Sequence, residues 1–278
     1  THFGTSNYEA EKPLLDEVER LFEVYRQTTD EAERKALYRQ IDSVSNEASK
    51  FAIPNEYDKL MAAIGATGTN AYTNFDVTCY TEDIPSNQIE NWAKVQADRF
   101  QNCVIRGFHT ELEAVYEEYN MGLASDSRTV IDTLRSMFFF NHPYGTQSVI
   151  GTQQHLKNPS ITNIKRYYET WYVPNNMAIC LSGDFDPDEM VAIIKKYFGN
   201  MKPNYNLPKS NFKPETPLTH PTTKEVRGVE AANVSLAWRL NGTASPDNDL
   251  AILASSLLYN DQAGLIDLDL IQAQKVLS

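Results

Sequence analysis

The stretch from residue 160 to residue 201 constrains the fold more than any other part of the chain. It reads as a helix in "SITNIKRYYETWY", a turn in "VPNN", a buried strand in "MAICLSG" and a second helix in "DPDEMVAIIKKYFGN". Helices and strands that alternate on this scale are typical of a domain in which helices pack on a sheet. The stretch therefore predicts a two-layer α and β domain.

Most of the chain before residue 160 has the apolar spacing of helices. Residues 14–50 predict a helical hairpin with a charged outer face, in which Thr29 or Asp30 caps the second helix. The segment "TNAYTNFDVTCYTEDI" is rich in strand-forming residues and predicts a strand or a strand pair. Four further helices are predicted, at the segment that Pro54 opens and at residues 86–104, 108–123 and 127–140.

The composition changes after residue 201. Residues 202–223 contain five prolines and little periodicity, which is typical of an extended linker. A strand in "VSLAWRLNG" and a helix in "DNDLAILASSLLYND" follow, and they are too little for an independent core. The predicted organisation is a first domain at 1–201, a linker at 202–223 and the start of a second domain at 224–278.

Composition and charge exclude several classes of function. With 25 Lys and Arg against 37 Asp and Glu, the net charge of -12 disfavours binding to nucleic acid. No apolar run is long enough to predict a membrane span. The three cysteines show no Cys-x-x-Cys pattern, so they predict neither a disulfide scaffold nor a thiolate zinc site.

Two glutamates mark the predicted helix at 108–123 as a candidate site. Glu111 and Glu118 are seven residues apart, so on a helix that turns by about 100° per residue they lie within roughly 20° of each other. Apolar positions such as Val115 and Met121 lie on either side of them, whereas Glu113 and Glu117 lie opposite. Unpaired carboxylates on a buried face would have to be protonated, paired or bound to a metal.

Four stretches together resemble the insulinase and pitrilysin family of zinc peptidases, which includes the mitochondrial processing peptidases. They are "NAYTNFDVTCY", "ELEAVYEEYN", "NHPYGTQSVIGT" and "YYETWYVPNNMAICLSGDFDPDEM", and their order and rough spacing match the family. The likeness is greatest to bacterial zinc proteases that carry an extra helical hairpin, here residues 14–50. The resemblance implies an α+β fold, with helices packed on an antiparallel or mixed sheet in two layers, plus the start of a second, similar domain.

The family signature is His-x-x-Glu-His on a helix, followed downstream by a glutamate ligand. By position, the resemblance implies that Glu118 is that third zinc ligand and that Glu111 is a supporting carboxylate that orients a ligating histidine. None of the five histidines of this chain forms the His-x-x-Glu-His motif. We therefore expect the chain to begin just downstream of its active-site helix, with Thr1 near the boundary, and to be inactive without the missing ligands.

The resemblance also implies a substrate-binding edge. In relatives the "NAYT" strand lies at a sheet edge and pairs with an extended peptide, so we expect Asn70, Ala71 and Tyr72 to line the peptide channel. An ordinary edge strand would show the same residues. On pattern alone, therefore, a structural role for these residues stays open.

The expected function is that of a fragment of a zinc-dependent metalloendopeptidase that cleaves extended peptides in a chamber formed by two similar halves. Its expected cofactor is Zn²⁺ in the parent protein, and its expected partners are a peptide or protein substrate and a second homologous half or subunit. The alternative is a non-catalytic, peptidase-like subunit that serves as a binding or structural partner. Relatives of this kind are often exported to the bacterial periplasm or cell envelope, but the sequence does not determine the location.

Overall fold

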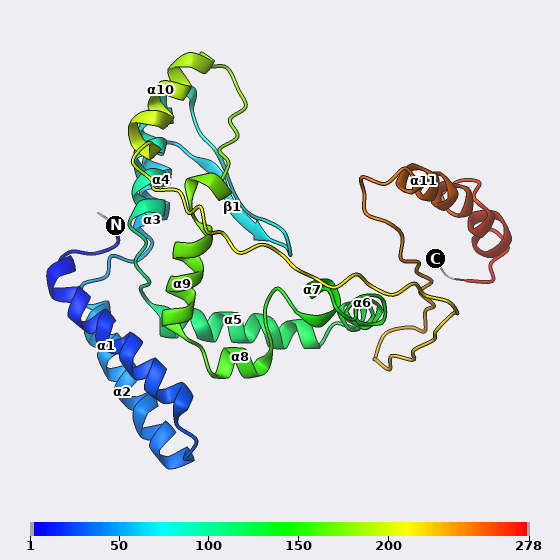
Figure 1. Cartoon of the computed structure of the whole chain (residues 1–278), viewed down its shortest axis with the longest axis horizontal. Coiled ribbons are helices and arrows are strands. Elements are labelled where there is room, and N and C mark those ends of the chain that lie inside the picture. The colour runs from blue at the N-terminus through cyan, green and yellow to red at the C-terminus, as the bar shows by residue number, and fades with distance from the viewer. Residues whose placement is uncertain (1–2, 277–278) are drawn as a thin grey trace.

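The computed structural model describes residues 3–276, so Thr1, which marks the expected boundary with the missing motif, lies outside the described residues. Figure 1 shows a largely helical chain around one two-stranded antiparallel sheet. The strands are β1 (Thr67–Thr73) and β2 (Thr78–Asp83). The helices are α1 (Tyr8–Gln27), α2 (Glu31–Ser49), α3 (Glu56–Ala63), α4 (Ile89–Gln101), α5 (Phe108–Leu123), α6 (Asp126–Phe138), α7 (Pro143–Thr146), α8 (Gln153–Lys157), α9 (Ile161–Trp171), α10 (Pro187–Phe198) and α11 (Asp247–Leu258).

Helices α1 and α2 form the predicted hairpin, but the first helix begins earlier than expected. Asn7 caps α1 by accepting a hydrogen bond from the Ala10 amide (3.2 Å), and the helix continues through Pro13. Pro13 thus lies inside the helix, beyond the first turn in which proline is tolerated best. Asp30 caps α2 as predicted, since its carboxylate accepts from the Glu33 amide at 2.8 Å.

The hydrophobic core lies where the hairpin meets α5 and α9. Phe22 is fully buried at its centre and makes an edge-to-face contact with Phe108, with ring centroids 5.2 Å apart. The side chains packed together here come from both hairpin helices and from the starts of α5 and α9. They are Val18, Leu21, Phe22, Ile41 and Ile161, with Tyr25, Leu37, Val44, Ile105, Phe108 and Leu112 partly buried against them.

The predicted strand pair is confirmed as the hairpin β1–β2. Asn74 closes the turn between the strands, because its side chain accepts hydrogen bonds from the amides of Asp76 and Val77. The other end of β2 is fixed by Glu82, whose carboxylate accepts hydrogen bonds from Tyr57, Trp92 and Gln96. These donors lie on α3 and α4, so one carboxylate ties the sheet to both helices.

Two predicted strands are not formed. Residues 177–183 ("MAICLSG") and 234–242 ("VSLAWRLNG") carry no strand in the structure, and the sheet has two strands, not the broader set of a two-layer domain. Met177 still has the extended backbone of a strand (φ −124°, ψ 153°). A strand exists only when its amides and carbonyls pair with a neighbour, and no neighbouring strand is present within residues 3–276.

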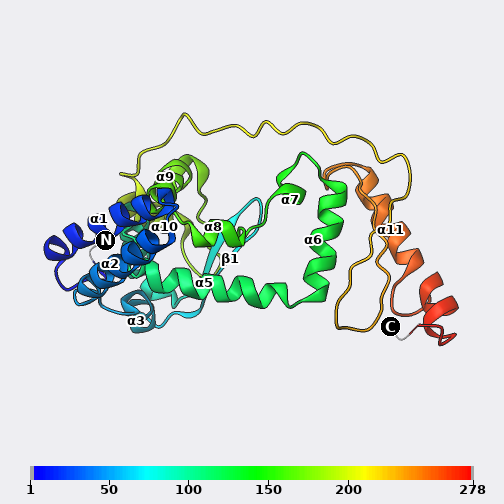
Figure 2. The ribbon, with the colours of Figure 1, turned by 90° about the horizontal axis from the view of Figure 1, so that it is seen from below.

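The predicted linker at 202–223 has no helix or strand, and it runs past α7 toward α6 and α11 (Figure 2). Glu215 attaches it to the end of α6, because its carboxylate accepts hydrogen bonds from the amides of Asn141 (2.6 Å) and His142 (2.8 Å). No described helix is long and apolar enough to cross a membrane.

Replacement of Phe22 by alanine should lower the free energy of unfolding by about 3–5 kcal/mol, because it leaves a cavity at the centre of the core. Urea unfolding measures the change. Val24→Ala on the same helix is the matched control, because Val24 is exposed and its truncation should cost less than about 1 kcal/mol. Equal losses in the two variants would show that the core does not centre on Phe22.

The hydroxyl of Tyr57 should make the fold sensitive to alkali. Burial, together with the hydrogen bond to Glu82, raises the pKa of Tyr57 from 10.0 to about 12. The unfolded chain therefore loses the Tyr57 proton first, so this contribution to stability is complete below pH 10.0 and is lost as the pH rises through about 12.

Urea midpoints measured between pH 9 and pH 12 test this contribution. Tyr57→Phe should be less stable at pH 9, because it loses the bond to Glu82, but its stability should fall less steeply above pH 10. Tyr205→Phe, at an exposed tyrosine, should keep the slope of the unsubstituted protein. An unchanged slope in Tyr57→Phe would contradict the assignment.

Candidate functional site

The helix that carries both candidate glutamates spans residues 108–123, as the sequence predicts. Gly107 precedes it in the left-handed region (φ +59°). Glycine has no side chain to accept a hydrogen bond from the first amides, so the start of α5 lacks a side-chain N-cap. At the other end, Ser125 caps α6, which turns away almost perpendicular to α5 (Figure 2). Helix α5 packs against the hairpin near its start and also contacts α8, where Gln153 Nε2 donates to the Tyr116 hydroxyl (3.0 Å).

Glu111 and Glu118 are both exposed, which corrects the expectation that they lie on a buried face. No residue of α5 is buried, and Met121 and Leu123 are 69% and 62% exposed. The face that carries Glu111 and Glu118 is therefore largely open within residues 3–276. Neither carboxylate forms a hydrogen bond or an ion pair with another described side chain, so both are available to a ligand.

The described residues do not by themselves fit a zinc ion. They contain no group of three or more His, Cys, Asp or Glu side chains placed to hold a metal, whereas zinc sites take three or four such donors. The nearest histidine in sequence, His109, faces the hairpin, with Nε2 3.7 Å from both Asp42 Oδ1 and Glu113 Oε1. Helix α5 therefore offers two carboxylates and no imidazole to a metal.

The start of α5 lies close to the start of the described chain. Arg106, two residues before α5, packs against Gly4, where an added Cβ would come within 3.0 Å of its guanidinium. The Arg106 Nε also donates to both oxygens of Glu11, at 2.8 and 2.9 Å. The first described residues and the segment that leads into α5 are therefore in contact through Arg106.

The Glu11–Arg106 pair is a feature that the sequence analysis missed. Its partners are separated by 95 positions, and neither lies in a recognisable motif. The one available signal is that Glu11 stands among the apolar positions of α1, three residues before Leu14. A carboxylate on a core-facing position indicates a buried partner but does not identify it.

The predicted substrate-binding residues lie on β1, as expected for an edge strand. In the antiparallel register Asn70 pairs with Thr81, Ala71 with Tyr80 and Tyr72 with Cys79. All three are exposed, and Tyr72 is 57% exposed. Because the described sheet has two strands, each strand has one open edge.

The turn of the sheet is fixed to the "HPYG" segment. Tyr144 donates a hydrogen bond to Asp76 Oδ2 (2.7 Å), and its ring packs against Phe75 with centroids 5.1 Å apart. His142 in turn accepts a hydrogen bond from the Tyr144 amide and starts α7. These contacts hold the strand hairpin in place, and Asn70, Ala71 and Tyr72 remain exposed.

The sequence of this chain is similar to those of known peptidases. Residues 160–271 match the family model described as the Peptidase M16 inactive domain. An uncharacterized zinc protease of Mycobacterium leprae is 30% identical over 142 residues, which cover 50% of this chain and 32% of that protein. The probable zinc protease PqqL of Haemophilus influenzae is 22% identical over 254 residues, 84% of this chain and 25% of that protein.

Two further comparisons concern a subunit and a fold. A probable mitochondrial-processing peptidase subunit beta of Schizosaccharomyces pombe is 26% identical over 138 residues, 49% of this chain and 30% of that protein. The crystal structure of a protease from Helicobacter pylori superposes with a TM-score of 0.54 at 23% identity, over 58% of this chain and 40% of that one, and this likeness concerns the fold alone.

The chain spans from 25% to 32% of the length of these three curated relatives. Two of the three are named as zinc proteases and the third as a subunit of a processing peptidase, and the matched family model is a peptidase domain. These findings show that the chain is similar to zinc peptidases of the insulinase type, and that residues 160–271 match a domain of that kind.

Proposed function

We propose that this chain is part of a zinc metalloendopeptidase that hydrolyses extended peptides. Its contribution to the metal centre is Glu118 on α5, with Glu111 as a supporting carboxylate that orients a ligating histidine. The two histidine ligands and the general-base glutamate come from residues outside 1–278. Residues 1–278 alone are accordingly inactive, because one carboxylate ligand does not hold zinc.

The observation that carries this proposal is that Glu111 and Glu118 share one face of α5 and have no partner among the described side chains. The helix is well formed, and the guanidinium of Arg106, two residues before the helix, contacts Gly4. Two unpaired carboxylates on a face with exposed apolar neighbours suit a surface that another segment covers. A covering segment that carries histidines would complete a donor set typical of zinc.

The same proposal assigns the substrate to β1. An extended peptide would add to the open edge of the sheet at Asn70, Ala71 and Tyr72, where main-chain hydrogen bonds give affinity with little dependence on sequence. Tyr72 would contact a substrate side chain, because its ring is exposed. A second homologous half or partner subunit would close the chamber around the peptide.

One observation favours a second candidate, a non-catalytic subunit that binds peptides or stabilises a partner. The family model matched by residues 160–271 describes an inactive domain. Glu111 and Glu118 lie outside that range, and a subunit without a metal has no chemical use for them. Zinc content and activity of the full-length protein separate the two candidates.

Glu118→Gln in the full-length protein should remove most of the bound zinc and lower peptidase activity by at least about 100-fold, because it deletes a charged ligand. Glu111→Gln should cost about 10- to 100-fold in activity or metal affinity, as expected for a residue that orients a ligand. Atomic absorption measures the zinc, and hydrolysis of a quenched fluorescent peptide measures the activity.

Glu117→Gln is the matched control, because Glu117 is adjacent, exposed and on the opposite face of α5. It should leave zinc content and activity unchanged. A full-length protein that has no zinc and no peptidase activity before any substitution would favour the non-catalytic subunit. Unchanged zinc content in Glu118→Gln would refute the assignment of the ligand.

Tyr72→Ala should raise the KM for peptide substrates by about 10-fold and change kcat little, because it removes binding surface without touching the metal ligands. Steady-state kinetics with several peptides measures both constants. Tyr205→Ala, at another exposed tyrosine, is the control and should leave both constants unchanged. A fall in kcat at constant KM would contradict a binding role for Tyr72.

A further inference from the structure

Helix α5 depends on distant contacts for its position. Its first residue follows Gly107, which makes no cap and has no atom within 4 Å of the place where a Cβ would stand. None of its sixteen residues is buried. The position of the start of this helix is therefore determined by what packs against its first turns and against the residues just before it, while α8 contacts the helix farther along at Tyr116.

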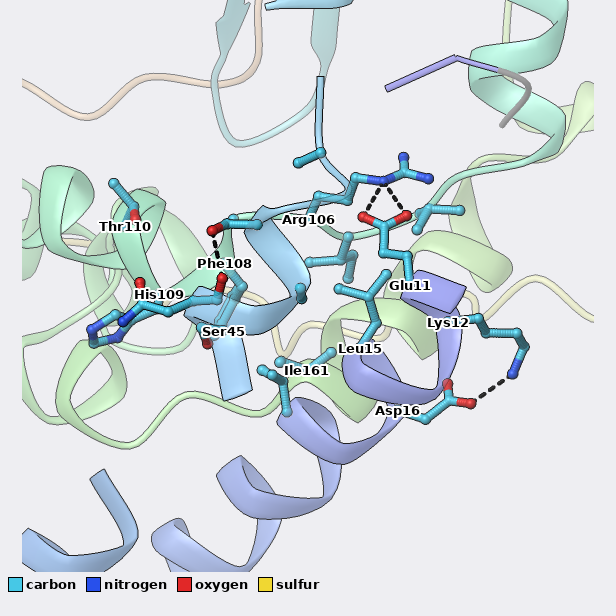
Figure 3. A pocket seen from close by; sticks show the side chains of 18 of the residues that line it. Glu11, Lys12, Leu15, Asp16, Ser45, Arg106, Phe108, His109, Thr110 and Ile161 are labelled. Atoms are coloured by element: carbon cyan, nitrogen blue, oxygen red, sulfur yellow. Dashed lines mark hydrogen bonds and ion pairs between the residues drawn. The ribbon is translucent and has the colours of Figure 1, made fainter. Parts of the chain in front are cut away.

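The polar part of that packing is the ion pair between Glu11 and Arg106. Glu11 is 1% exposed and Arg106 14% exposed, and the guanidinium Nε donates to both carboxylate oxygens at 2.8 and 2.9 Å. Figure 3 shows the two side chains meeting head to head between α1 and the chain that leads into α5. An ion pair this deeply buried adds little net stability, but it penalises any geometry in which either charge loses its partner.

The apolar part is supplied by the same hairpin. Phe108, the first residue of α5, packs edge-to-face against Phe22, and Leu112 one turn later lies against the same core. On the neighbouring face of the helix, His109 packs against the ring of Tyr38 on α2, with centroids 5.0 Å apart. The first turn of α5 thus packs against both helices of the hairpin.

From these contacts we infer that the hairpin α1–α2 positions α5, and that Glu11 and Arg106 are the positioning residues for the face that carries Glu111 and Glu118. The inference rests on the proposed function only in one respect, namely that the face with Glu111 and Glu118 binds a metal. The hairpin thereby gains a role beyond its own stability. Displacement of the hairpin by a ligand or partner would change the position of the glutamates.

Because α5 is long, small changes at its start have a large effect on the position of Glu118. Glu118 lies ten residues beyond Phe108, which is about 15 Å along a helix axis at 1.5 Å per residue. A tilt of about 10° at the start of the helix would therefore move Glu118 by roughly 2.5 Å, which exceeds the error of about 1 Å that catalytic geometry tolerates. A small change in the contacts at the start of α5 would therefore change the position of Glu118.

Hydrogen exchange of the full-length protein, followed by mass spectrometry in EDTA, tests the inference without any bound metal. Arg106→Met and Glu11→Gln should each speed the exchange of amides in residues 108–123 by about 10-fold, because the start of α5 loses its anchor. Amides of β1 and β2 should change by less than about twofold, since the sheet is held by Glu82 instead. The double variant should show no more than the larger single effect, because both substitutions remove one interaction.

Lys12→Met is the matched control. It removes an ion pair with Asp16 on the same helix, next to Glu11 in sequence, but this pair is exposed and points away from α5 (Figure 3). Exchange in residues 108–123 should stay unchanged in this variant. If Arg106→Met fails to fold, Glu11→Gln alone decides the question, because it keeps the size and one acceptor oxygen of the native side chain.

Two results would overturn the inference: unchanged exchange in residues 108–123, or an equal acceleration in β1 and β2, which would indicate a global loss of stability. The outcome is independent of the proposed function. If Glu118→Gln left zinc content unchanged, the proposed ligand would be refuted, whereas the exchange result would stand.

Discussion

The packing of the hairpin α1–α2 onto the starts of α5 and α9 is the interaction on which the described structure depends. Phe22 is fully buried at its centre, and the side chains around it come from segments separated by more than a hundred positions. Elsewhere the helices bury little: α5, α6 and α11 have no buried residue at all. This contact region fixes the start of α5, because burial of apolar side chains supplies most of the stability of a fold. The strand β1 is held separately, since Glu82 ties the sheet to α3 and α4.

Three segments of the chain have the sequence pattern of buried elements but are exposed in the structure. The glutamate face of α5, the extended residues 177–183 and the alternating apolar residues of 234–242 all have the pattern of buried elements, yet all are open within residues 3–276. Each would be satisfied by a neighbour that supplies either a packing face or strand hydrogen bonds. The candidate metal ligand lies on one of these surfaces, so completion of the fold and completion of the site are the same event in the proposed enzyme.

The candidate site is divided between a rigid part and an open part. Strand β1 is held in register with β2, and its turn is attached through Asp76 to Tyr144 near the end of α6. The start of helix α5 is held by an ion pair and an aromatic contact, and Glu111 and Glu118 have no partner among the described side chains. This arrangement suits a peptidase in which the peptide adds to a fixed edge while the metal ligand is brought into place by the packing of a separate helix.

The sequence alone determined what local chemistry controls. Helical spacing predicted α5 at residues 108–123, Asp30 was a recognisable cap, and the "NAYT" segment formed part of the expected strand pair, because periodicity and capping act between near neighbours. Burial and pairing were decided by the tertiary structure. The arc around Glu118 is apolar in sequence but largely exposed, "MAICLSG" forms no strand although Met177 is extended, and the Glu11–Arg106 pair joins positions 95 apart without a motif. These outcomes depend on which distant segment packs alongside, and a pattern within one segment carries no information about that neighbour.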